Sequence, residues 1–338
     1  MVFFIVVLRA LATCLITNSH YVGVYPSDII ANGGLLGDII FFAVSGYCLL
    51  NNNKSFPRWF GKRIWRIYPA VILVTVFYFY VLKHDLFVLR KQHIHGFEEF
   101  IWWYIYPTFY HFVASIVVLY IPYYFVGRYE AFKKRIPLIA GLVGAIYLAY
   151  YVIFYDKSYY HVDSIDEHAI RFLFFEAMLL GGYFKYNDEK FRNKFNWSLP
   201  IITVVLFVGY FASKLLFSRY KFLAPFQIVN QFVILALLFV VFWFFASIDK
   251  RLENLPKWIK SCLTYLASIT LEIYLVQQVI VESLVPHFTF PINWVVITAS
   301  ILASATALHY VCKLIYWGVD KLIDFLKNKF VKKEEKAE

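Results

Sequence analysis

Two ionisable side chains interrupt the apolar segment near the N-terminus: Arg9 and His20, in the run FFIVVLRALATCLITNSH. On one helix they lie about three turns apart, roughly 16 Å along the axis, on nearly the same face. An ionisable residue inside a membrane span costs at least ~2.5 kcal/mol on insertion scales, so it marks a polar cavity. A neutral imidazole at the far end of that face suits general-base catalysis. The alternative is that Arg9 is a structural ion-pair partner and His20 an interfacial residue.

A carboxylate follows on the next apolar segment, after a short turn rich in Gly, Pro and Asn. Asp38 lies about a turn and a half inside that segment, at a depth comparable to His20 on an antiparallel neighbour. A carboxylate there would orient the imidazole and raise its basicity, as in a catalytic triad. Asp38 is equally suited to cap or solvate the helix start.

These side chains need a membrane scaffold to position them. The chain is 61% hydrophobic and only 16% charged over 338 residues, which indicates an all-α polytopic membrane protein. We expect about ten transmembrane helices around a central polar cavity, in one domain over 1–318, with a charged tail over 319–338. The predicted spans are 2–22, 34–50, 67–82, 100–126, 137–155, 168–186, 198–217, 225–247, 262–284 and 293–318.

The basic residues predict the orientation of these spans. Most of the 33 Lys and Arg residues fall in alternate connections and in the tail. Cytoplasmic loops carry such an excess, so both termini are predicted to be cytoplasmic. The net charge of +11 is then mostly a topology signal, and its spread over short loops argues against a nucleic-acid partner.

The connection after the second span, NNNKSFPRWFGKRIWRIYPA, is the most informative stretch. Ser55 and Pro57 resemble a helix start, and aromatic residues alternate with basic ones as in an amphipathic helix at the membrane interface. Arg63 and Arg66 are three residues apart on one face, which suits two guanidinium groups to a polyphosphate. Ordinary positive-inside charge with tryptophan anchors is the other interpretation.

Several of these motifs occur together in one family. The chain resembles the acyltransferase-3 family of integral membrane O-acyltransferases. The resemblance extends to PTFYHFVASIVVLYIP in the fourth span and SITLEIYLVQ in the ninth, and Gln277 stands where many members have a histidine. The matching residues of the N-terminal part are Arg9, Ala10, His20, Phe41, Phe42, Ser45, Gly46, Tyr47, Arg63, Arg66, Tyr68 and Pro69.

The resemblance implies acyl transfer from a cytoplasmic acyl-CoA, usually acetyl-CoA, to a hydroxyl of an extracytoplasmic glycan. Arg63 and Arg66 would hold the CoA phosphates, and the pantetheine arm would rise along the face of Arg9. His20 would act as general base, or else carry the acetyl group covalently. The matched motifs also place Ser45, Tyr47 and Tyr274 among the substrate-binding residues.

Other candidates lie further along the chain. Glu176 and Glu272 are both at mid-membrane depth, and either could neutralise Arg9; two glycines favour Glu176, because they let its helix approach closely. His111 is predicted to line the cavity, unless it is a satisfied core residue. His93 and His95 fall on an outer loop with no third ligand, so no metal is expected. A transporter or flippase for a lipid-linked glycan would share these intramembrane charges and remains the alternative function.

Overall fold

The structure is a computed structural model that describes residues 2–83, 97, 101, 110–164 and 169–334. The described residues form helices and no strands, so the all-α prediction is confirmed. The main helices are α1 (Phe3–Ser19), α2 (Gly34–Leu49), α3 (Phe56–Val76), α6 (His111–Arg128), α8 (Ile136–Phe154), α9 (Ile170–Tyr186), α11 (Ser198–Arg219), α12 (Ile228–Ser247), α14 (Lys257–Ser268), α15 (Thr270–Leu284) and α16 (Ile292–Glu334). Short helices α7 (Glu130–Lys134), α10 (Asp188–Phe191) and α13 (Asp249–Glu253) join them.

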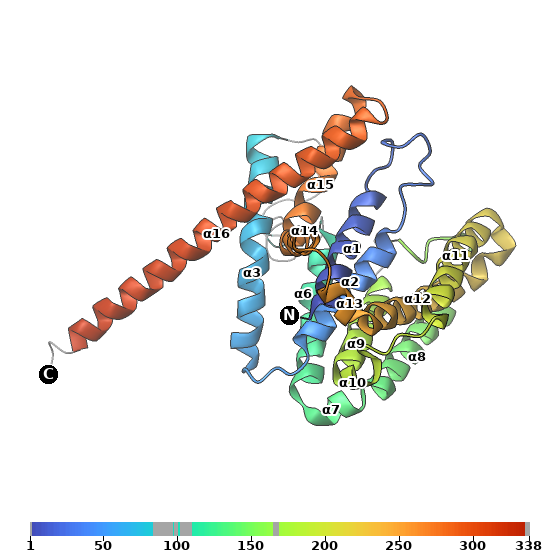
Figure 1. Cartoon of the computed structure of the whole chain (residues 1–338), viewed down its shortest axis with the longest axis horizontal. Coiled ribbons are helices and arrows are strands. Elements are labelled where there is room, and N and C mark those ends of the chain that lie inside the picture. The colour runs from blue at the N-terminus through green and yellow to red at the C-terminus, as the bar shows by residue number, and fades with distance from the viewer. Residues whose placement is uncertain (1, 84–96, 98–100, 102–109, 165–168, 335–338) are drawn as a thin grey trace.

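The centre of the bundle is formed by α1, α2 and α9, with α6 and α12 beside them (Figure 1). Helices α2 and α9 meet backbone to backbone through glycines. A Cβ on Gly46 would overlap the Met178 carbonyl, and one on Gly181 would overlap the Ala43 carbonyl. Small residues allow such close approach between helices in a membrane, so these positions fix the spacing of α2 and α9.

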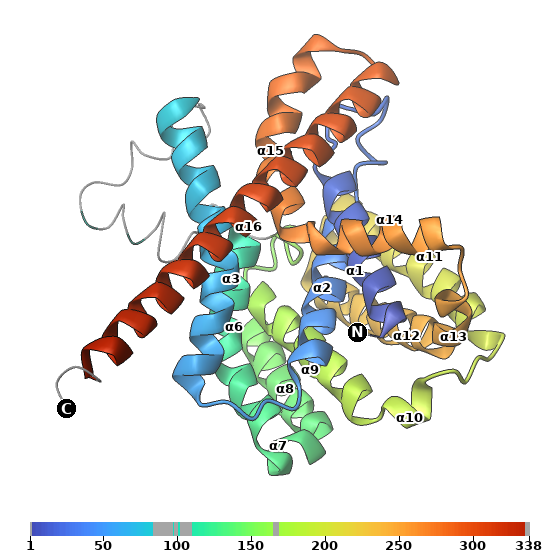
Figure 2. The same ribbon diagram turned by 60° about the vertical axis from the view of Figure 1, so that its left-hand side comes forward.

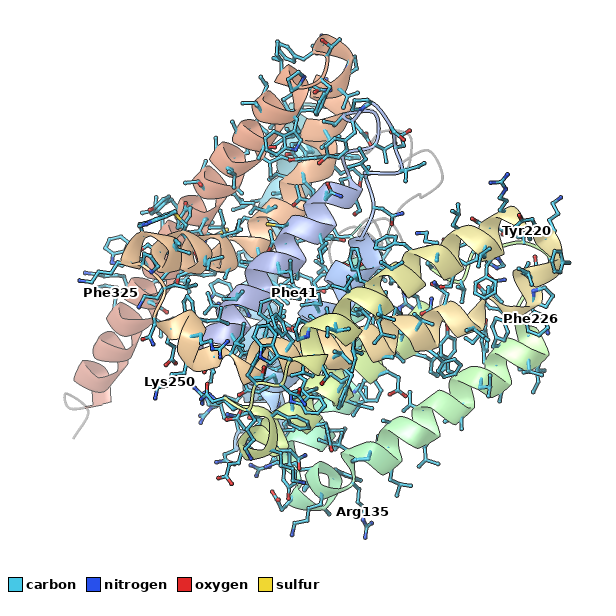
Figure 3. All side chains as sticks on the ribbon, turned by 45° about the vertical axis from the view of Figure 1, so that its right-hand side comes forward. Phe41, Arg135, Tyr220, Phe226, Lys250 and Phe325 are labelled. Atoms are coloured by element: carbon cyan, nitrogen blue, oxygen red, sulfur yellow. The ribbon has the colours of Figure 1, made fainter. Side chains whose placement is uncertain are left out.

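The periphery is apolar and little buried within the chain. In the most hydrophobic stretches of α8 and α11, 17% and 11% of residues are buried. Figure 3 shows Tyr220 and Phe226 at the tip of the α11–α12 hairpin, far from Arg135 at the bottom of the view and from Lys250 on its left. Apolar side chains that find no protein partner on these helices are suited to contact lipid.

Six described helices are long and apolar enough to cross a membrane: α3, α6, α8, α11, α12 and α16. A seventh is added if α14 and α15 count as one span. Helices α1 and α2 are apolar but have 17 and 16 residues, or roughly 25 Å at 1.5 Å per residue. The chain is therefore an integral membrane protein, while the count of ten spans and the side of the termini stay predictions.

Three predicted boundaries differ from the structure. The predicted span 262–284 is broken, because α14 and α15 meet at an angle of 70° around Ile269 (Figure 2). The predicted interfacial helix does not stand alone; it forms the first turns of α3, which continues through Pro69. Helix α16 runs unbroken past 318 to Glu334, so the last predicted span continues as helix into the predicted tail, whose separation from the membrane domain stays a prediction.

Candidate active site

A cavity of about 820 Å³ lies between α1, α2, α3, α6, α15 and the first half of α16. Binding pockets for small molecules and cofactors typically have roughly 300–1,000 Å³, so its size suits a large cofactor. Five of the predicted site residues line it: Arg9, Ser45, Arg63, Arg66 and Tyr274. The predicted central polar cavity is therefore present, and it brings the two arginine motifs together.

One end of the cavity is basic. We call it the basic mouth; the side chains that define it are Lys54, Lys62, Arg63, Arg66 and Lys313. Arg63 is held in place by Trp59, whose ring lies 3.9 Å from the guanidinium carbon and whose carbonyl accepts a bond of 2.7 Å from Nη1. Trp59 is only 1% exposed, so the chain fixes Arg63 through an aromatic residue and leaves its charge available.

Arg9 lies deeper in the same cavity. Its guanidinium carbon is 5.8 Å from the centre of the Phe41 ring, which Figure 3 places near the middle of the bundle. Its Nε atom is buried and has no hydrogen-bond partner among the described residues. Cys48, Arg66 and Tyr120 are its charged or titratable neighbours. The predicted ion pair with Glu176 or Glu272 is thus not formed.

The two candidate carboxylates lie elsewhere. Glu272 lines the cavity, but its Oε1 is 2.7 Å from Nδ1 of His309 on α16. Glu176 does not line the cavity; it faces Gly144 of α8, and its Oε1 has no hydrogen-bond partner among the described residues. Glu272 is the only acidic side chain among the described residues that line the cavity. The cavity therefore has a strong excess of positive charge, which suits a polyanion.

Next to Arg9, on the same face of α1, polar contacts between α1 and α15 build one wall of the cavity. The hydroxyls of Thr13 and Thr270 lie 3.1 Å apart. About a turn further along, the Thr17 hydroxyl donates to Oε1 of Gln277 at 2.8 Å. All four residues line the cavity. They extend it from the basic mouth toward His20, which follows Thr17 by three positions at the end of α1.

Past this wall lie His20, His111 and Asp38, which we call the histidine cluster. Nε2 of His111 is 3.8 Å from Oδ2 of Asp38, and His20 is close enough to His111 for their charges to interact. Tyr274 packs against the His111 ring with centroids 6.3 Å apart and also lines the cavity. Tyr274 therefore stands between the cavity and the cluster.

The cluster corrects one sequence expectation. Asp38 was expected to orient His20, but the imidazole beside its carboxylate is that of His111. The reason is that His20 falls at the C-cap of α1, just past the last helical turn, whereas His111 starts α6 at the level of Asp38. His111 thus joins the site through Asp38 and does not line the cavity itself.

Tyr47 serves a different purpose from the one expected. Its hydroxyl donates to Asp188 at 2.7 Å, and it does not line the cavity. Arg192 joins Asp188 to Asp249, which accepts the backbone N–H of Phe4 at 2.8 Å. Burial lowers the pKa of Arg192, but the hydrogen bond and charge of Asp249 outweigh burial and raise it. This network anchors the start of α1, and so the depth of Arg9.

Sequence reasoning missed two pairs in the cavity, His309 with Glu272 and Gln277 with Thr17. The two residues of each pair are more than 30 positions apart in the sequence, and no spacing motif connects them. A polar residue in an apolar helix was the one available signal for His309 and Gln277. The predicted outer-loop residues His93 and His95 lie outside the described residues.

The fold and the cavity together define a helical membrane protein with an internal cavity whose charged lining is mostly cationic. The sequence profile of the acyltransferase-3 family, described as an acyltransferase domain, matches residues 2–313. The chain belongs to this family, and it is a membrane O-acyltransferase. Comparison with curated proteins and with solved structures gave no significant match. Family membership favours acyl transfer over the transporter or flippase alternative.

Proposed function

We propose that this protein moves an acetyl group from cytoplasmic acetyl-CoA to a hydroxyl of an extracytoplasmic cell-surface glycan. One observation supports this most: a single cavity is lined by a cluster of cations at one end and leads toward a histidine cluster at the other. The cations suit the phosphates of CoA, and a histidine suits the proton transfer that attack by a hydroxyl requires. The positive-inside rule assigns the basic mouth to the cytoplasm.

In this proposal the donor lies lengthwise in the cavity. Arg63 and Arg66 hold the phosphates, and Trp59 holds Arg63 in position before the ligand arrives. Holding a side chain in its bound geometry lowers the entropy cost of binding. The pantetheine arm then passes Arg9 and Ser45, and the thioester ends near Thr17 and Tyr274, next to His20.

His20 acts on the acceptor in this proposal. As general base it takes the proton of the sugar hydroxyl while the oxygen attacks the thioester carbonyl, a role that typically gives 10²- to 10⁴-fold acceleration. A covalent acetyl-histidine is the competing route. Trapping a labelled acetyl group on His20, in protein quenched before the glycan is added, would favour the covalent route.

The proposal is tested with detergent-purified protein and labelled acetyl-CoA. We expect saturable binding, and slow release of free CoA when no glycan is present. Absence of any acetyl-CoA binding would overturn the donor assignment. The acceptor is identified by comparing the O-acetyl content of surface polysaccharide, by NMR, between wild-type and deletion strains; identical spectra would contradict a glycan acceptor.

A further inference from the structure

The side-chain amide of Gln277 is an unpaired donor inside the cavity. Gln277 is 0% exposed, lines the cavity, and has no partner for Nε2 among the described residues. Its other end is fixed, because Oε1 accepts the bond from Thr17. The amide is therefore held in one orientation with its N–H groups unsatisfied.

Such an arrangement costs stability. A buried polar group left without a hydrogen bond loses its contacts with water and gains none in return. A buried glutamine that binds Thr17 through its oxygen and leaves its nitrogen free is suited to a ligand that supplies an acceptor. No described side chain satisfies Nε2, and the residue lines the cavity, so a ligand that fills the cavity to this depth can supply the acceptor.

The position of Gln277 identifies which part of a ligand it meets. Its partner Thr17 precedes His20 by three positions, so the two lie about one helical turn apart on α1. Tyr274 precedes Gln277 by the same interval on α15 and packs against His111. Gln277 thus lies at the junction of the cavity and the histidine cluster, where the donor and acceptor would meet.

We propose that Nε2 of Gln277 donates a hydrogen bond to the carbonyl oxygen of the donor's acyl group. This inference rests on the proposed function, since it takes an acyl thioester as the ligand. The bond strengthens as negative charge develops on that oxygen, which is the arrangement of an oxyanion hole. The bond from Thr17 keeps the amide in place, so Thr17 is a positioning residue.

The chemical step follows from this placement. The hydroxyl oxygen of the acceptor attacks the acyl carbon while His20 removes the hydroxyl proton, and the π electrons of the carbonyl move onto its oxygen. Gln277 stabilises that oxyanion. When the carbonyl re-forms, the C–S bond breaks, sulfur leaves with the electron pair, and His20 returns the proton to it. The products are the acyl ester and free CoA.

The experiment compares Gln277→Leu with Gln278→Leu in full-length purified protein. Gln278 is the next residue on α15, is outside the cavity lining, and donates to Glu282 at 3.2 Å, so it is a matched control. Affinities for acetyl-CoA and for free CoA are measured by calorimetry, and kcat is measured as the release of free CoA from acetyl-CoA with no glycan present. Free CoA lacks the acyl carbonyl, so it is the critical comparison.

We expect Gln277→Leu to weaken acetyl-CoA binding about 5- to 10-fold, consistent with one hydrogen bond, and to leave CoA binding unchanged. We expect kcat to fall by about 10²-fold, as for removal of an oxyanion donor. Thr17→Val, which keeps the amide but frees its orientation, should lower kcat less. Gln278→Leu should match wild type in all three measurements.

Each other outcome has a defined meaning. Equal loss of acetyl-CoA and CoA affinity in Gln277→Leu, or wild-type kcat, would overturn the inference while leaving the proposed function intact. Failure of the wild-type protein to bind either ligand would overturn the proposed function itself. If Gln277→Leu does not fold, the Thr17→Val result decides: unchanged kcat contradicts the role of the amide.

Discussion

The two ends of the site differ in how their charges are compensated. At the basic mouth, Arg63 and Arg66 face the cavity, and no carboxylate of the described part of the chain forms an ion pair with either. In the histidine cluster, a carboxylate and an imidazole lie 3.8 Å apart. Uncompensated charge gives affinity for an opposite charge, whereas paired groups hold a geometry and exchange protons. In the proposed function, the basic mouth of the cavity therefore binds the donor, and the histidine cluster beyond the cavity wall does the chemistry.

The largest effect is expected from His20→Ala. Loss of the imidazole should lower kcat by about 10²- to 10⁴-fold, because general-base assistance is removed. Acetyl-CoA affinity should change little, because the phosphates are held at the other end. Glycan acetylation and calorimetry measure the two quantities separately, and normal acetylation would remove His20 from the chemistry.

A smaller effect is expected at the basic mouth from the double variant Arg63→Lys with Arg66→Lys. Lysine keeps the charge but loses the planar fork that binds phosphate in a bidentate manner. A loss of ~2 kcal/mol would weaken acetyl-CoA binding about 30-fold, with kcat restored at high donor concentration. Arg58→Lys, on the same helix but outside the cavity lining, is the control. Wild-type affinity in the double variant would mean that the two arginines do not bind phosphate in a bidentate manner and serve only to orient the protein in the membrane.

Asp38→Asn and His111→Gln test which imidazole the carboxylate serves. If Asp38 acts through His111, each single change and the double change should reduce kcat by a similar factor, about tenfold, because contacting residues are not additive. If Asp38 acts on His20 directly, the factor by which the double change lowers kcat should equal the product of the two single factors. The steady-state kcat of wild type, the two single variants and the double variant gives a double-mutant cycle that distinguishes the two cases.

The smallest effect is expected from salt. Raising the ionic strength shortens the screening length from about 10 Å at 0.1 M to about 3 Å at 1 M. The dissociation constant of acetyl-CoA should rise a few-fold, since the basic mouth is open to solvent, while kcat at saturating donor stays constant. A salt-dependent kcat with constant affinity would reverse the assignment of the two ends.

The features that could be predicted from the sequence are those that depend on residues close together in the chain. Arg9 and His20 fall on one helix, and Arg63 and Arg66 on one turn of another, so helical geometry alone relates the members of each pair. The apolar spans and the helical class follow from composition in the same way. The sequence did not predict the bend at Ile269, because no glycine or proline lies at that position or next to it. Nor did it predict which carboxylate meets which base, since that depends on the rotation of α6, α15 and α16 about their axes.

The close glycine contacts between α2 and α9 limit how these two helices can move relative to each other. Because the Gly46 and Gly181 contacts leave no room even for a methyl group, α2 cannot slide or rotate against α9 without separating from it. Helix α2 carries Ser45 of the cavity and Asp38 of the histidine cluster, so both ends of the site share one rigid wall. Any movement that widens the cavity must therefore come from its other lining helices, which include α3, α15 and α16.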